Sequence, residues 1–467
     1  MGNSVKRKIT AVIAAVLCCV LFLSGCDALT LNSPENLVRP PKLSGDDGAL
    51  QAAFEKAMAE KGEFILKYPS AGEYRSAYVR NDCDGDGADE AFVFYSLKAE
   101  EMSVYMYMLD YYDKEWHPVG DVIGEGNDVY SVEFCDLNSD GVSEVFVGWR
   151  SIDSKANKKL CVYYSDNYMN RMNYRMLAIE PYTSLYTVDL DFDGQKEIIT
   201  ALINATADSY TTVARLLKMT TDNGSVWQLT PVGQVNLYSG ITSVLNMKSG
   251  LTGGRRYVYI DEAAGDSYLT EMIYWDNYQN SLLSAFVVDG VSIADCPTSR
   301  KLPLICTDVN KDGRLEIPHT TLLENSSVIK TEDENSVKSL QNENVYVTDW
   351  LDYDEGRFTV SESYIENSEG GFRIAYDKAS MSDWAVKFFP DEGISQFFIT
   401  RPGTEPDSTP DASLLFTVSE MSLNEAVDEE LVIAKASDRV YVYDITENGE
   451  LRGIDAEYIR SIFSLVP

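Results

Sequence analysis

D-C-D-G-D-G-A-D-E runs from Asp82 to Glu90, and three further stretches of the chain repeat its pattern. They are D-L-N-S-D-G-V-S-E at 136–144, D-L-D-F-D-G-Q-K-E at 189–197 and D-V-N-K-D-G-R-L-E at 308–316. Each copy has a carboxylate or amide side chain at positions 1, 3 and 5, a glycine at position 6 and a glutamate at position 9. Oxygen-bearing side chains therefore converge on one tight turn in all four copies.

Oxygen ligands gathered around a turn are the donor set that Ca²⁺ prefers in proteins. An EF-hand loop shares the first six positions, but it continues to a bidentate glutamate at position 12. Position 12 is here Val93, Val147, Thr200 or His319, so these loops are not EF-hands. Residues typical of strands precede and follow the loops, as in E-A-F-V-F-Y from Glu90. The predicted unit is a strand, a calcium loop and a second strand.

The spacing of the copies predicts what these units build. Asp82 and Asp136 are 54 residues apart, and the next copy follows after 53 residues. A period near fifty residues is the size of a propeller blade. The last interval is 119 residues, which leaves room for one copy that has lost its acids, near Asn246. We predict a blade without metal there, with the ammonium of Lys248 in place of the ion's charge.

This repeated unit resembles the FG-GAP or VCBS-type repeats of integrin-α-like β-propellers, over residues 70–360. The resemblance implies four-stranded blades around an axis and one calcium ion per intact loop, about four ions in all. The chain departs from the family near Asn246 and at Pro318, which would interrupt a central strand, and five blades are visible. The metal ligands that the resemblance implies are Asp82, Asp84, Asp86, Glu90, Asp136, Asn138, Asp140, Glu144, Asp189, Asp191, Asp193, Glu197, Asp308, Asn310, Asp312 and Glu316.

The first residues predict export. A basic start at Lys6-Arg7-Lys8 precedes an apolar stretch, 9–23, that is short for a membrane-spanning helix. The stretch ends in Leu23-Ser24-Gly25-Cys26, which resembles the bacterial lipobox. That resemblance implies a signal peptide over 1–25, cleavage before Cys26 and lipid on this cysteine. An ordinary cleaved signal is the alternative. Several acyl chains on one residue would anchor the protein stably outside the cytoplasmic membrane.

Composition agrees with this location. The whole chain has a net charge of −35, and removing the three basic residues of the signal peptide leaves 36 basic against 74 acidic residues. Such a surface repels nucleic acid, which we exclude as a partner. Five cysteines remain beyond Cys26, without the spacing of a disulfide framework, and we predict them to be small buried residues. Cys296 and Cys306 are the candidate disulfide pair.

The chain divides into four predicted parts. The signal peptide at 1–25 is followed by a proline-containing tether at 26–47. Residues 48–360 hold a helix, with Leu50, Phe54, Met58 and Ile65 at roughly helical spacing, and then the β-propeller. Residues 361–467 lack the acidic loop, and we predict an α+β domain there. Its expected strands lie at 371–376, 384–389, 396–399, 414–418, 431–434 and 439–443, before a helix capped by Asp455.

Catalysis has little support in the sequence, and we name no catalytic residue. The chain has two histidines, His117 and His319, and neither a zinc-binding histidine pair nor a G-x-S-x-G elbow. The main prediction is therefore a calcium-binding cell-surface lipoprotein, a non-catalytic scaffold that presents a propeller face to a protein or glycan. The alternative is an envelope enzyme that cleaves polysaccharide, as a hydrolase or lyase, with carboxylates on the propeller face.

Overall fold

The computed structural model describes residues 46–466, apart from 152–153, 166–173, 207–208, 223–225, 287–289, 332–339, 401–412 and 426. The predicted signal peptide, Cys26 and nearly all of the tether lie outside the described residues. Within the described part of the chain, no helix has the length and apolar character needed to cross a membrane.

Four antiparallel sheets follow one another along the chain, each built from consecutive strands. The first contains β1 (Phe64–Leu66), β2 (Tyr78–Asn81), β3 (Glu90–Leu97), β4 (Tyr105–Tyr112) and β5 (Glu115–Ile123). The second contains β6 (Asp128–Cys135), β7 (Glu144–Ser151), β8 (Ser154–Ser165) and β9 (Tyr174–Tyr182). The third contains β10 (Ser184–Val188), β11 (Glu197–Ala205), β12 (Tyr210–Asp222) and β13 (Val226–Leu237). The fourth contains β14 (Ser243–Thr252), β15 (Arg255–Ala264), β16 (Ser267–Asp276) and β17 (Ser281–Ser284).

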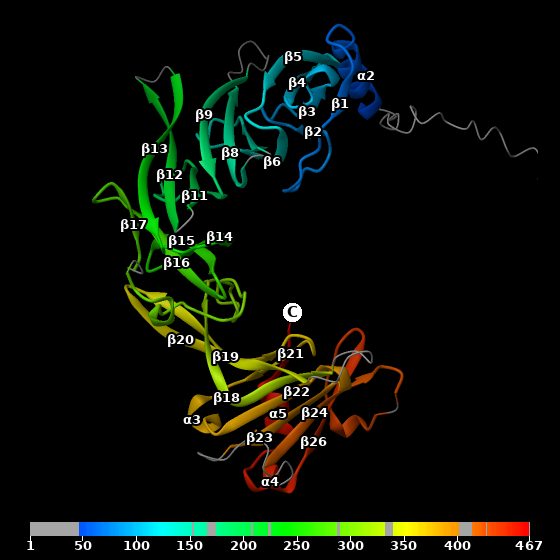
Figure 1. The fold of residues 1–467 in the computed structure, drawn as a ribbon, viewed down its shortest axis with the longest axis vertical. Coiled ribbons are helices and arrows are strands. Elements are labelled where there is room, and N and C mark those ends of the chain that lie inside the picture. Colours follow the sequence, from blue (N-terminus) through cyan, green and yellow to red (C-terminus); the bar gives the residue numbers. More distant parts are fainter. Residues whose placement is uncertain are drawn as a thin grey trace, which may run out of the picture.

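These sheets pack face to face in the order of the chain and lie along an arc (Figure 1). Phe92 and Phe94 of the first sheet share a core with Val145 and Trp149 of the second. Similar cores join the second sheet to the third and the third to the fourth. Because each middle strand is covered on both faces, β3, β7 and β11 are buried along nearly their whole length. That double burial explains their continuous apolar runs.

The last part of the chain forms one ten-stranded sheet. It begins with β18 (Ile317–Thr331), directly after the fourth acidic loop, and β19 (Leu340–Asp354) and β20 (Arg357–Asn367) pair beside it. Its other strands are β21 (Phe372–Ala375), β22 (Trp384–Phe389), β23 (Ile394–Ile399), β24 (Leu414–Ser422), β25 (Val432–Lys435), β26 (Arg439–Ile445) and β27 (Phe463–Leu465). The boundary expected at residue 361 falls within β20.

Few helices accompany the sheets in the described residues. They are α2 (Asp46–Met58), α3 (Lys378–Met381), α4 (Glu447–Leu451) and α5 (Ala456–Ile462). Helix α2 covers the first sheet through Leu50, Phe54 and Met58, as expected from their spacing. Ile65 does not continue this helix: it lies in β1, 38% exposed. Asp455 caps α5 by accepting a hydrogen bond from the amide of Tyr458 at 2.8 Å, as the sequence predicts.

The expectation of a mainly β protein is confirmed, and the predicted strands of the last hundred residues all form. Pro318 does not interrupt β18. It pairs with Trp350 of β19 on one side, and β22 joins the other side of β18 only at Ser327 and Val328. The strand therefore needs no ladder hydrogen bond from the missing N–H of the proline, because this end of β18 is an edge. The five cysteines in the described chain are all buried and free, so Cys296 and Cys306 do not pair.

Candidate functional site

The four acidic loops share one internal geometry. In each, the glutamate at position 9 accepts a hydrogen bond from the backbone N–H of position 2. The donors are Cys83, Leu137 and Leu190 at 2.7 Å and Val309 at 2.8 Å. Each glutamate is also the residue that begins β3, β7 or β11, or that directly precedes β18. One buried side chain thus ties the start of each loop to the strand that follows it.

In three of the loops, the aspartate at position 1 is hydrogen-bonded to the glycine at position 6. Asp82, Asp136 and Asp308 each accept a hydrogen bond from the amide of the position-6 glycine, at 3.1, 3.0 and 2.9 Å. That glycine has a positive φ in all four loops, for example +88° at Gly141, which L residues rarely adopt. The repeated glycine is therefore a requirement of the turn itself.

This geometry brings predicted ligands together in three loops. One carboxylate oxygen from each member lies within 4.8 Å of the others in the groups Asp82, Asp84 and Asp86; Asp189, Asp191 and Glu197; and Asp308, Asp312 and Glu316. In the second loop the amide of Asn138 donates to Asp140 at 2.9 Å instead. The sequence predicted all of these residues as ligands.

The surroundings of the position-9 glutamates favour a nearby cation. Burial, with neighbouring aspartates adding to it, raises the pKa of Glu90 and Glu144 to about 8. It also raises the pKa of Glu316. Oε1 of Glu144 and Oε1 of Glu316 are buried and have no hydrogen-bond partner. A buried, unpartnered carboxylate oxygen is costly without a cation, so the second and fourth loops fit a hard metal ion. The first loop fits one through its group of three aspartates.

The third loop differs, because a lysine ammonium already lies among its carboxylates. Nζ of Lys218, from β12, contacts Asp191, lies 3.2 Å from Glu197 and lies 3.3 Å from Asp193. Arg256 of β15 donates to the backbone oxygen of Asp189. These two protein cations partly satisfy the acids, although Oδ1 of Asp189 is buried without a hydrogen-bond partner and burial still raises the pKa of Glu197 to about 7. The difference from the other loops is that an ammonium already contacts the carboxylates that would hold an ion.

The fourth sheet has no acidic loop at the expected place. Strand β14 continues through Asn246, with a register shift between Val244 and Asn246, and turns into β15 at Gly253 and Gly254, which both have positive φ. Lys248 does not replace an ion: its ammonium donates to the backbone oxygen of Cys306 at 3.3 Å. The buried cation of this sheet is Arg300, which lies 3.0 Å from Asp261. The prediction of a cation stand-in at Lys248 is therefore wrong.

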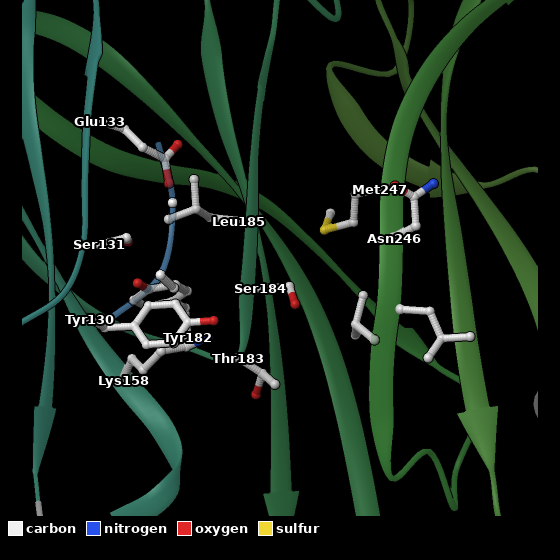
Figure 2. Close-up of a pocket in the computed structure, with 14 residues that line it drawn as sticks. Tyr130, Ser131, Glu133, Lys158, Tyr182, Thr183, Ser184, Leu185, Asn246 and Met247 are labelled. Carbon is white, nitrogen blue, oxygen red and sulfur yellow. The ribbon is translucent and has the colours of Figure 1, made fainter. Parts of the chain in front are cut away.

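A pocket of about 340 Å³ lies where the first strands of the second, third and fourth sheets come together. Figure 2 shows Tyr130, Glu133, Lys158 and Tyr182 on one side of it and Met247 on the other. The residues that line it are Ala71, Gly72, Tyr130, Ser131, Glu133, Lys158, Tyr182, Thr183, Ser184, Leu185, Val244, Leu245, Asn246 and Met247.

An amine and a carboxyl with shifted pKa values face this pocket. The ammonium of Lys158 lies 3.9 Å from the ring centre of Tyr130 and 4.9 Å from that of Tyr182. Burial lowers the pKa of Lys158 to about 8, with a smaller contribution from the charge of Arg150. Burial raises the pKa of Glu133, and the charge of Lys158 opposes that rise. The pKa values of both groups are thus shifted towards neutral pH, where general acid and base catalysts work best.

Sequence reasoning missed these pocket residues, since none of them belongs to the acidic phrase. Tyr130 lies in β6 and Tyr182 ends β9, the first and last strands of one sheet, so no local signal indicated that they line the same pocket.

No family model matches the chain, and no curated protein matches it. The chain is similar to a solved structure of fructan 1-exohydrolase IIa from Cichorium intybus in complex with 1-kestose, with 11% identity and a TM-score of 0.25. The similarity covers 68% of this chain and 62% of that chain, so this chain spans less than two thirds of the enzyme's length.

This comparison corrects the main functional expectation. The expectation of a non-catalytic scaffold for binding or adhesion is not supported, because the similar structure is that of a fructan 1-exohydrolase. The predicted alternative, an enzyme acting on polysaccharide, agrees better with it. A TM-score of 0.25 carries no argument about the fold, substrate or catalytic residues of this chain.

Proposed function

We propose that the chain is a polysaccharide-cleaving enzyme built on a calcium-stabilised β-propeller of the FG-GAP or VCBS type. The observation that carries the proposal is that Lys158 and Glu133 line the same side of one pocket, together with two tyrosines. In this proposal each of the first four sheets is one blade, β18–β20 of the ten-stranded sheet are the fifth, and the pocket lies on the inner side of the blades. The enzyme acts outside the bacterial cytoplasmic membrane, held by lipid on Cys26.

The pocket suits a sugar ring. The half-buried ring of Tyr130 offers apolar surface for the C–H face of a pyranose, whereas Tyr182 is buried at 2% exposure and supports the wall from behind. The hydroxyl of Ser184 and the amide of Asn246 line the same space and can hydrogen-bond sugar hydroxyls. A cavity of about 340 Å³ is in the range of small-ligand sites.

The acid and base present favour elimination over hydrolysis. Glycoside hydrolysis ordinarily uses two carboxyl groups, whereas Glu133 is the one carboxylate among the described residues that line this pocket. In an elimination, neutral Lys158 takes the proton from the carbon next to a uronate carboxyl, and that electron pair forms a carbon–carbon double bond. The glycosidic C–O bond breaks, and protonated Glu133 gives its proton to the leaving oxygen.

A substrate screen tests this function. Full-length protein is incubated with polygalacturonate, alginate and hyaluronan, and the unsaturated product is followed by ultraviolet absorbance. We expect turnover on a uronate polymer and a loss of about 10²-fold or more in Lys158→Met and Glu133→Gln, the usual weight of one acid or base.

Matched controls use exposed residues outside the pocket. Lys159→Met changes the neighbouring lysine, which pairs with Glu125 instead, and Glu115→Gln changes an exposed glutamate at the start of β5. Both are expected to keep the wild-type rate. New reducing ends without unsaturation would replace elimination by hydrolysis, and no product from any uronate polymer would refute the proposed enzyme.

A further inference from the structure

One strand position faces the position-9 glutamate in every sheet that has an acidic loop. In the first sheet Ala91 pairs with Leu109, so the next pair outward is Glu90 with Asp110. The same step places Tyr164 opposite Glu144 and Lys218 opposite Glu197. In the ten-stranded sheet, Ile317 pairs with Leu351, which places Asp352 opposite Glu316. We call these four residues, Asp110, Tyr164, Lys218 and Asp352, the facing residues.

The facing residue reaches the acidic loop because paired residues of an antiparallel ladder point to the same side of the sheet. The third loop demonstrates the contact directly, since the ammonium of Lys218 lies 3.2 Å from Glu197. In the first and fourth loops, the same register places the carboxylates of Asp110 and Asp352 beside Glu90 and Glu316. The position therefore contributes a charge to the first, third and fourth loops.

These charges have opposite consequences for a bound cation. Asp110 and Asp352 each add one carboxylate to a loop that already has several, and more ligand charge favours Ca²⁺. Tyr164 adds none. Lys218 instead supplies a positive charge in contact with three of the four predicted ligands of its loop. A Ca²⁺ ion placed there would have to displace the ammonium of Lys218, whose side chain is only 16% exposed.

Further contacts hold the third loop closed without an ion. The amide of Asn277, in the turn after β16, donates to the backbone oxygen of Asp191 at 3.2 Å. Arg256 donates to the backbone oxygen of Asp189 and lies 3.9 Å from its carboxylate. The fourth sheet thus supports a loop of the third sheet through two side chains. Ion pairs within the protein do here what a metal ion would do in the other loops.

We propose that the facing residue decides which acidic loops bind calcium: the third loop takes Lys218 as its resident cation and binds none. The first and fourth loops, with Asp110 and Asp352, bind most tightly, and the second loop, with Tyr164, binds more weakly. This inference rests on the proposed role of the loops as calcium sites. It reduces the expected number of ions from about four to three.

Counting bound ions tests this inference. Calcium is measured on the full-length protein by native mass spectrometry and isothermal titration calorimetry, with CaCl₂ as the only ligand. Wild type is expected to bind three ions, and Lys218→Asp four, because the exchange gives the third loop the facing residue of the first. The reverse exchange, Asp110→Lys, is expected to bind two ions. Lys196→Met is the control, since it removes a lysine from the same loop at an exposed position.

Each result separates the inference from the proposed function. Four ions on wild type, or no extra ion on a folded Lys218→Asp variant, would refute the role of the facing residue. No ion on wild type would refute the calcium role of the loops altogether. Should Lys218→Asp fail to fold, as judged by circular dichroism, an unchanged count in Asp110→Lys would still refute the inference.

Discussion

At the scale of single residues, the chemistry of this chain depends on partly buried charges. Lys158 lies between two tyrosine rings, and Glu133 lies nearby on the wall of the same pocket. Removing water from both groups disfavours their charged forms, which lowers the pKa of the lysine and raises that of the glutamate. Lys218 shows the opposite outcome: carboxylates in direct contact outweigh its burial and raise its pKa.

The lysine of the pocket predicts a pH dependence of stability. Its pKa is about 8 in the folded protein against a reference value of 10.5. Between these values the unfolded chain binds more protons than the folded chain, so the free energy of unfolding rises with pH. We expect the difference in Tm, wild type minus Lys158→Met, to increase as the pH rises from 8 towards 10.5. Scanning calorimetry measures it. A Tm difference that does not change with pH would contradict the lowered pKa.

At the scale of elements, the pocket depends on how the second sheet packs beneath it. Gly148 of β7 lies against the hydroxyl of Tyr182, and a methyl group there would also come within 2.9 Å of the hydroxyl oxygen of Ser131. The Tyr182 hydroxyl is buried and without a hydrogen-bond partner. A glycine in a middle strand therefore sets the position of one wall of the pocket.

This contact predicts a coupling between two substitutions. Gly148→Ala is expected to lower the free energy of unfolding by about 1–3 kcal/mol, because the added methyl overpacks the site. In the double variant with Tyr182→Phe the hydroxyl is gone, and much of that loss should be recovered. Urea unfolding of the wild type, both single variants and the double variant measures the coupling energy. Strictly additive losses would show that the two side chains do not meet.

At the scale of the whole molecule, successive sheets pack face to face, and an acidic loop lies before a middle strand in three of them. The chain carries a net charge of −35, and the loops concentrate part of it in single turns. Bound cations would relieve that repulsion, and an ion that binds only the folded state stabilises it by mass action.

Calcium removal should therefore lower the stability of the entire chain. At a free concentration one hundred times the dissociation constant, each occupied site adds about 2.7 kcal/mol to the free energy of unfolding. We expect the Tm to fall in EDTA and to return when excess CaCl₂ is added. Excess NaCl at equal ionic strength is the control for general charge screening. An identical melt with and without EDTA would exclude a structural role for the ion.

Much of the fold could be predicted because its signals are local. Each loop is shaped by hydrogen bonds that span few residues, such as the one between Glu144 and the amide of Leu137. The strands around the loops are marked by apolar runs, and the cap of α5 by Asp455. Sequence reasoning failed where a partner lies far along the chain. It placed a cation at Lys248, whereas the structure has Lys218 in the third loop and Arg300 in the fourth sheet.

The amino-acid sequence by itself determined the four acidic turns, the strands that flank them and the mainly β character of the chain. Each of these depends on side chains and backbone groups within about one turn or strand of each other. The folded arrangement alone revealed which residue faces each loop, since strand register brings Lys218 to a glutamate 21 residues earlier in the chain. It also made the pocket, because Tyr130, Lys158, Ser184 and Met247 come from different strands that meet only when three sheets pack together.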